Sequence, residues 1–147
     1  MKNVQPVYFL DSSLILKRYF REPGTDQIIK LFGTSIQWCT ASLSYAEVFC
    51  TFKRLHKTSV VSAETFKVMA AAFRADWTNA HKLEFTREAQ SLIPEILQRV
   101  YLKGADAVQL STALALKNQG ISVVFGTSDQ PLLMAAKLMR LETLKLG

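Results

Sequence analysis

Short apolar runs alternate along the chain with segments whose apolar residues recur at helical spacing. The first run contains four apolar residues in a row and predicts a strand buried on both faces. This alternation indicates an α/β fold: a single domain over residues 1–147, with a mostly parallel central sheet of about four to five strands flanked by helices. The predicted strands cover 7–10, 36–40, 122–126 and, from weaker stretches, 83–85 and 144–146.

Hydroxyl and aspartate residues that can cap a first turn precede most of the helical segments. Ser42 or Ser44 is expected to cap one of them. Pro94 is expected near the beginning or at a restart of its helix, because a helix interior tolerates proline poorly. The predicted helices cover about 12–20, 25–32, 44–57, 62–77, a segment from 86 onward, 105–118 and 128–139.

The composition favours a globular protein, with 49% apolar and 20% charged residues in 147. The longest apolar run, 68–73, is too short to cross a bilayer, and the first residues lack the apolar region of a signal peptide. We therefore expect no membrane association and a cytoplasmic location. Cys39 and Cys50 form no metal-ligand spacing or disulfide framework, and both are expected as buried free thiols.

The net charge of +6 suits a polyanionic partner such as a nucleic acid, although many small basic proteins bind none. A more specific pattern arises if four of the 12 acids converge in one pocket. The 18 basic residues then face eight remaining acids, and the rest of the chain carries +10.

Three acids follow predicted strands closely: Asp11, Glu47 and Asp129. In a parallel sheet these strand ends share one edge, where α/β proteins bind ligands. A fourth acid, Asp106, shares a helix face with the apolar residues 110, 113 and 114, which predicts that it points toward the interior. Each acid also has an ordinary explanation. Asp11 and Asp129 are good helix caps, Asp106 favours its own first turn, and Glu47 can be a solvated residue near Arg54.

Carboxylates that lie close together raise one another's pKa and destabilise the fold unless a cation offsets the repulsion. The candidate ligands are all oxygen, which favours Mg²⁺ or Mn²⁺ over Zn²⁺. Such ions suit phosphodiester hydrolysis, because they activate water and stabilise the leaving oxygen.

Four short motifs resemble, in order, the acidic motifs of PIN-domain ribonucleases, above all the VapC toxins of prokaryotic type II toxin–antitoxin pairs. Any one motif is weak, but the ordered set is specific and spans roughly the whole chain. The motifs occupy 8–13 (Tyr-Phe-Leu-Asp-Ser-Ser), 44–47 (Ser-Tyr-Ala-Glu), 105–110 (Ala-Asp-Ala-Val-Gln-Leu) and 127–129 (Thr-Ser-Asp).

The resemblance implies a Mg²⁺-dependent endoribonuclease, with Mn²⁺ as an alternative metal. It implies a homodimer held in check by a cognate antitoxin that wraps the toxin. Many relatives carry a basic residue after the last acid, where this chain has Gln130-Pro131, and this departure concerns phosphate binding. The metal-binding acids would be Asp11, Glu47, Asp106 and Asp129, with Thr127 and Ser13 as supporting catalytic positions.

Several basic residues near the motifs are candidates for an RNA path, although an ordinary solvated face explains any single one equally simply. His56 and His81 are expected at or near the surface and are not needed as bases. Trp38 and Trp77 are expected in the core or a dimer surface. The basic candidates are Lys17, Arg18, Arg21, Lys53, Arg54, Lys57 and Lys103.

Other classes of protein explain parts of the pattern. A PIN-fold nuclease that processes RNA outside a toxin pair keeps the same site. A haloacid-dehalogenase-like phosphatase needs a second aspartate where this chain has Ser13. A receiver domain needs an acidic pair on the first strand, and this is not evident. A non-catalytic RNA- or protein-binding module with the same fold is the third class.

Overall fold

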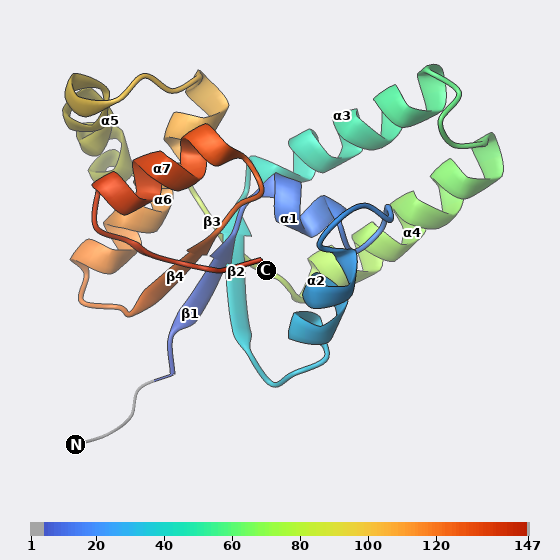
Figure 1. The fold of residues 1–147 in the computed structure, drawn as a ribbon, viewed down its shortest axis with the longest axis horizontal. Coiled ribbons are helices and arrows are strands. Elements are labelled where there is room, and N and C mark those ends of the chain that lie inside the picture. The colour runs from blue at the N-terminus through green and yellow to red at the C-terminus, as the bar shows by residue number, and fades with distance from the viewer. Residues whose placement is uncertain (1–4, 147) are drawn as a thin grey trace.

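Five parallel strands form the centre of the molecule in the order β3-β2-β1-β4-β5 (Figure 1). The computed structural model describes residues 5–146. The sheet confirms the predicted α/β architecture and its parallel strands. The strands are β1 (Val7–Leu10), β2 (Gln37–Ala41), β3 (His81–Leu83), β4 (Val123–Gly126) and β5 (Glu142–Thr143).

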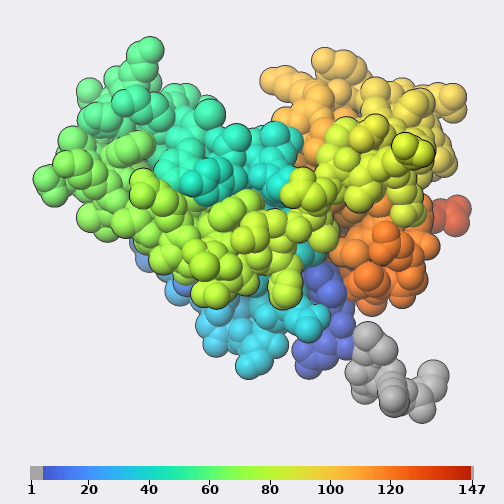
Figure 2. Space-filling model, turned by 180° about the vertical axis from the view of Figure 1, so that it is seen from behind, coloured from blue at the N-terminus to red at the C-terminus, as the bar shows by residue number. Residues whose placement is uncertain are grey.

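Helices cover both faces of the sheet, in two groups that are separate in the chain (Figure 1). One face packs against α1 to α4, and the other packs against α5 to α7. From behind, the α3–α4 hairpin and the α5–α6 region form two lobes, with the start of α3 between them (Figure 2). The helices are α1 (Ser12–Leu16), α2 (Thr25–Phe32), α3 (Ser44–Lys57), α4 (Ala63–Asn79), α5 (Arg87–Arg99), α6 (Gly104–Asn118) and α7 (Gln130–Leu138).

The central strand β1 is buried on both faces, as its apolar run predicts. Phe9 belongs to the core cluster under α5 to α7, and Leu10 belongs to the cluster under α1 to α4. This division follows from the alternation of side chains along a strand. In register, Phe9 lies beside Phe125 of β4, and their rings stack with centroids 5.5 Å apart.

Gly126, at the end of β4, allows α1 to pack closely against the sheet. A Cβ atom at this position would lie 2.6 Å from Leu14 Cδ1 and 3.0 Å from Leu10 Cδ2. Any larger residue would push α1 away. The close approach brings the start of α1 next to Thr127, which follows Gly126 directly.

The central elements agree with the predicted boundaries better than the edges do. The first helix ends at Leu16 and continues only as turns, and the edge strands β3 and β5 begin two residues earlier than expected. The predicted serine cap of α3 is wrong. Leu43 is the N-cap, and its apolar side chain cannot make a cap bond. Ser44 is the first residue of α3, and it is buried and hydrogen-bonds to Thr40.

Pro94 lies inside α5, not near its beginning or at a restart, so that prediction is wrong. Pro94 is exposed, whereas Ala89 and Ile96 on the same helix are fully buried. The face of α5 that carries Ala89 and Ile96 packs extensively against α6, and this packing keeps the helix continuous across the proline.

The two thiols are free, but only Cys39 is buried. Cys50 is exposed, contrary to expectation. It lies on the opposite side of α3 from the buried residues Val48 and Phe52, so the apolar neighbours in its sequence do not surround it in space.

The remaining expectations about single side chains hold. Trp38 packs against Phe32, and Trp77 packs against Tyr45 and Phe73. His56 is partly buried, and His81 is exposed. No helix within residues 5–146 is long and apolar enough to cross a membrane.

Candidate functional site

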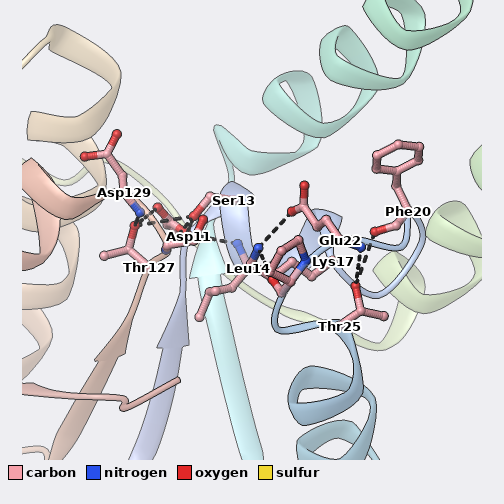
Figure 3. Close-up of polar contacts among 11 residues, drawn as sticks. Asp11, Ser13, Leu14, Lys17, Phe20, Glu22, Thr25, Thr127 and Asp129 are labelled. Carbon is pink, nitrogen blue, oxygen red and sulfur yellow. Dashed lines mark hydrogen bonds and ion pairs between the residues drawn. The ribbon is translucent and has the colours of Figure 1, made fainter. Parts of the chain in front are cut away.

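Asp11 lies at the carboxyl end of β1 and is the most deeply buried acid of the site, with 3% of its surface exposed. It caps α1, as its sequence position allows, because Oδ1 accepts a hydrogen bond from the Leu14 amide at 3.2 Å. Two hydroxyls also donate to it, each at 2.6 Å: Ser13 to Oδ1 and Thr127 to Oδ2 (Figure 3). Both carboxylate oxygens of Asp11 are therefore held in place.

Ser13 and Thr127 also join the segments that follow β1 and β4. The Ser13 hydroxyl accepts from the Ser128 amide at 3.0 Å, and the Thr127 hydroxyl accepts from the Asp129 amide at 3.1 Å. Because β1 and β4 are parallel neighbours, residues 116 positions apart meet at the same edge of the sheet. The two hydroxyls predicted to support the site do contact Asp11.

Burial raises the pKa of Asp11 from 3.8 to about 6. Desolvation is the largest cause, because the low-dielectric interior penalises the charged form. The hydrogen bonds from Ser13, Thr127 and the Leu14 amide lower the pKa but do not cancel this effect, and the charge of Glu47 raises it further. Asp11 and Glu47 therefore repel each other across the site.

Asp106, in the first turn of α6, is half-buried, and its pKa is also raised. Desolvation is the largest cause, followed by the charges of Asp129 and Glu47, while Lys103 lowers the pKa. Glu47 of α3 and Asp129 at the start of α7 are thus both close enough to act on Asp106 of α6. Lys103, the N-cap of α6, is the basic residue whose charge opposes them here.

Glu47 is partly buried and is held by α6. Gln109 donates from Nε2 to Glu47 Oε1 at 2.8 Å and to the Ser44 hydroxyl at 2.9 Å. Ser44 in turn shares a 2.7 Å hydrogen bond with Thr40 of β2. The alternative for Glu47 is a solvated residue near Arg54; instead, Glu47 is partly buried and bonded to Gln109, and no ion pair within residues 5–146 joins it to Arg54.

Asp129 is exposed and caps α7, where its Oδ1 accepts from the Leu132 amide at 2.9 Å. Its carboxylate points away from that of Asp11 (Figure 3). The capping explanation of Asp129 is therefore correct, and the same side chain also acts on the pKa of Asp106.

The four predicted acids thus lie around one edge of the sheet and are linked through their charges. Among the described residues, no three acidic, histidine or cysteine side chains are already arranged as a metal site. The chemistry of the donors nevertheless fits a hard divalent cation such as Mg²⁺ or Mn²⁺, which prefers carboxylate oxygens. A cation would also relieve the repulsion that raises the pKa values of Asp11 and Asp106.

The sequence pattern indicated no site role for Gln109 and only a capping role for Ser44, although both are almost completely buried in this network. The Oε1 atom of Gln109 is buried without a hydrogen-bond partner within the described part of the chain. A usable signal was present: Gln109 is a polar residue three positions after Asp106, next to the apolar face of α6.

Several predicted RNA-path residues are already engaged. Lys17 is not an exposed cation but is buried, and its Nζ atom contacts Glu22 at 3.0 Å and the Pro23 carbonyl at 2.7 Å (Figure 3). Arg18 pairs with Asp76 at 2.9 Å and Arg21 with Asp26 at 2.9 Å. The exposed residues Lys53, Arg54, Lys57 and Lys103 stay predictions.

Comparison of the sequence with protein-family models and with curated proteins gives no match. Solved structures do match over nearly the whole chain. FitAcB from Neisseria gonorrhoeae is 14% identical, with a TM-score of 0.70 over 94% of this chain and 96% of that chain. VapBC2 from Rickettsia felis, bound to a promoter DNA fragment, is 13% identical, with a TM-score of 0.65 over 95% and 99%.

A third similar structure is VapC20 from Mycobacterium tuberculosis, a toxin that cleaves the sarcin–ricin loop. It is 17% identical, with a TM-score of 0.63 over 87% of this chain and 94% of that chain. At these identities the likeness establishes the fold. The chain therefore has the PIN-like fold of VapC-type toxins, as the order of its acidic motifs predicts.

Proposed function

We propose that the protein is a VapC-like endoribonuclease that hydrolyses RNA phosphodiesters with Mg²⁺ or Mn²⁺. The observation that carries this proposal is the gathering of four carboxylates at the edge where parallel sheets bind their ligands, with Glu47 acting on Asp11 and with Glu47 and Asp129 acting on Asp106. The structural likeness to VapC-type toxins supports it. The metal would be held among Asp11, Glu47, Asp106 and Asp129.

A bound divalent ion supplies an activated water molecule and stabilises the leaving oxygen of the phosphodiester. The side chains of the protein prepare the ligands. Ser13 and Thr127 fix both oxygens of Asp11, and Gln109 fixes one oxygen of Glu47. Lys103 lies near Asp106 and can attract the phosphate backbone of the substrate.

A cognate antitoxin and a homodimer are further parts of the proposal. The similar structures include VapBC2, and the motif resemblance implies both partners. Light scattering of the purified chain tests the dimer: we expect twice the 16.5 kDa mass of one chain. A monomer at micromolar concentrations would contradict this part alone.

The catalytic proposal is tested by incubating labelled RNA with the purified protein and Mg²⁺, with and without EDTA. Cleavage is expected with Mg²⁺ only, and Asp106→Asn is expected to lower it at least a hundredfold. Asp26→Asn is the matched control, because Asp26 is exposed on α2 and pairs with Arg21. Full activity of Asp106→Asn with an intact fold would refute the assigned role.

The same assay separates the other classes of protein. A phosphatase would hydrolyse p-nitrophenyl phosphate and leave RNA intact. A non-catalytic module would bind RNA without cutting it. Sequencing of the RNA ends that the protein produces identifies the cleaved site.

A further inference from the structure

A cavity of about 740 Å³ lies next to the carboxylate site. Its walls come from the segment after α1, from α7 and from the C-terminal segment around β5. Thr127, Ser128 and Gln130 form the side nearest to the carboxylates, and Lys17, Lys137 and Lys145 contribute the positive charges.

The cavity and Asp11 share a wall. Thr127 lines the cavity, and its hydroxyl donates a 2.6 Å hydrogen bond to Asp11 Oδ2. Ser128 also lines the cavity, and its amide donates to the Ser13 hydroxyl that contacts Asp11. A polymeric ligand that lies over the sheet edge at Asp11 can therefore extend directly into the cavity.

The charge of the cavity is opposite to that of the neighbouring site. Among the described residues that line it there are three lysines and no aspartate or glutamate. The charge of Lys17 is already paired with Glu22. Lys137 and Lys145 are exposed, and no ion pair within residues 5–146 includes either of them.

We infer that this cavity binds the backbone of the RNA nucleotides next to the cleaved bond, with Lys137 and Lys145 neutralising the phosphates. This inference rests on the proposed function, because it takes RNA as the substrate. A polyanion would be repelled by the carboxylates alone, so an adjoining region of free positive charge is needed to hold it. Leu133 and Leu144 provide apolar surface in the same cavity for a ribose or base.

RNA explains the arrangement better than an acidic protein segment does. Lys137 and Lys145 adjoin the site of the proposed reaction. An RNA strand cleaved at that site extends beyond it in both directions, so the protein must bind nucleotides next to the cleaved bond. This chain has Gln130-Pro131 where many proteins with the resembling motifs carry a basic residue. Lys137 and Lys145 supply positive charge in the same cavity that Gln130 lines, which fits this assignment.

The test is the affinity for labelled single-stranded RNA, measured by fluorescence anisotropy in Mg²⁺. All variants carry Asp106→Asn so that RNA stays intact, which is checked on a gel. Lys137→Gln with Lys145→Gln is expected to weaken binding about tenfold and to reduce the salt slope by about 1.4. Lys67→Gln with Arg87→Gln removes two exposed charges outside the cavity and is expected to leave both quantities unchanged.

The outcomes separate this inference from the catalytic proposal. If the wild-type chain fails to cleave RNA but the two lysines still govern RNA binding, the cavity assignment stands and the nuclease does not. Equal RNA affinities for the cavity and control variants overturn the assignment, and so does the absence of RNA binding by the Asp106→Asn parent. Weaker binding of poly-glutamate with unchanged RNA binding would also overturn it, because the cavity then serves an acidic protein segment.

Discussion

Gln109 of α6 donates a hydrogen bond to Glu47 of α3, with 2.8 Å between Nε2 and Oε1. The oxygen of the same amide is buried and has no hydrogen-bond partner among residues 5–146. Gln109→Leu removes two favourable hydrogen bonds, to Glu47 and to Ser44, together with one unfavourable buried oxygen. Because these effects oppose each other, we expect the free energy of unfolding to change by less than about 2 kcal/mol. RNA cleavage is expected to fall about tenfold, because Glu47 loses its orienting partner.

Gln109→Glu provides the sharper comparison. It places a second carboxylate against Glu47 in a buried position, which at pH 7 should lower the free energy of unfolding by about 3 kcal/mol or more. Part of this loss should be recovered at pH 4, where a carboxyl can be protonated. Urea unfolding at the two pH values measures both effects, with Ser111→Ala on the same helix as control. Equal midpoints for Gln109→Glu and the wild type would show that the two side chains are not in contact.

Asp11 should make the protein less stable as the pH rises. Its pKa of about 6 in the folded chain exceeds the ordinary 3.8, so the folded state retains this proton after the unfolded state has lost it. The contribution of Asp11 to the free energy of unfolding is therefore full below about pH 4. It falls by about 3 kcal/mol as the pH rises through 6.

The difference between the wild type and Asp11→Asn isolates this effect when both are unfolded in urea with EDTA between pH 4 and 8. We expect the wild type to lose stability relative to the variant across this range. A wild type that gains stability relative to Asp11→Asn as the pH rises would contradict the raised pKa.

Thr127 is expected to contribute through its hydroxyl. Thr127→Val removes the donor to the buried Asp11 carboxylate and the acceptor of the partly buried Asp129 amide. The free energy of unfolding at pH 7 should fall by about 1–3 kcal/mol. The pKa of Asp11 should rise further, because this hydrogen bond lowers it. Thr127→Ser keeps the hydroxyl and should restore most of the loss, so valine and serine variants of equal stability would argue against this role.

The sequence predicts best those elements whose pattern and burial agree. The apolar run of β1 and the N-cap of α7 can be recognised from the neighbouring residues alone. They place Asp11 and Asp129 correctly after the parallel strands β1 and β4. The short edge strands β3 and β5 pair on one side only, so little in their own residues specifies where they begin.

Two side chains make contacts that their own sequence neighbourhood does not indicate. Ser44 resembles a helix cap in the sequence, but the approach of α6 makes it a buried partner of Gln109. Lys17 resembles a surface cation, yet the turn after α1 folds Glu22 and the Pro23 carbonyl onto it. Neither contact follows from the spacing of residues in the sequence. The first depends on how α6 packs against α3, and the second depends on the conformation of the turn after α1.

The central claim is that the four acids serve one divalent ion, and direct titration with Mn²⁺ tests it. Calorimetry should be performed on the wild type, on Asp11→Asn, Glu47→Gln, Asp106→Asn and Asp129→Asn, and on Asp26→Asn as control. We predict that the wild type and the control bind Mn²⁺ alike and that each site variant binds it at least tenfold more weakly. Undetectable binding by the wild type, or equal affinity in all the variants, would contradict the claim.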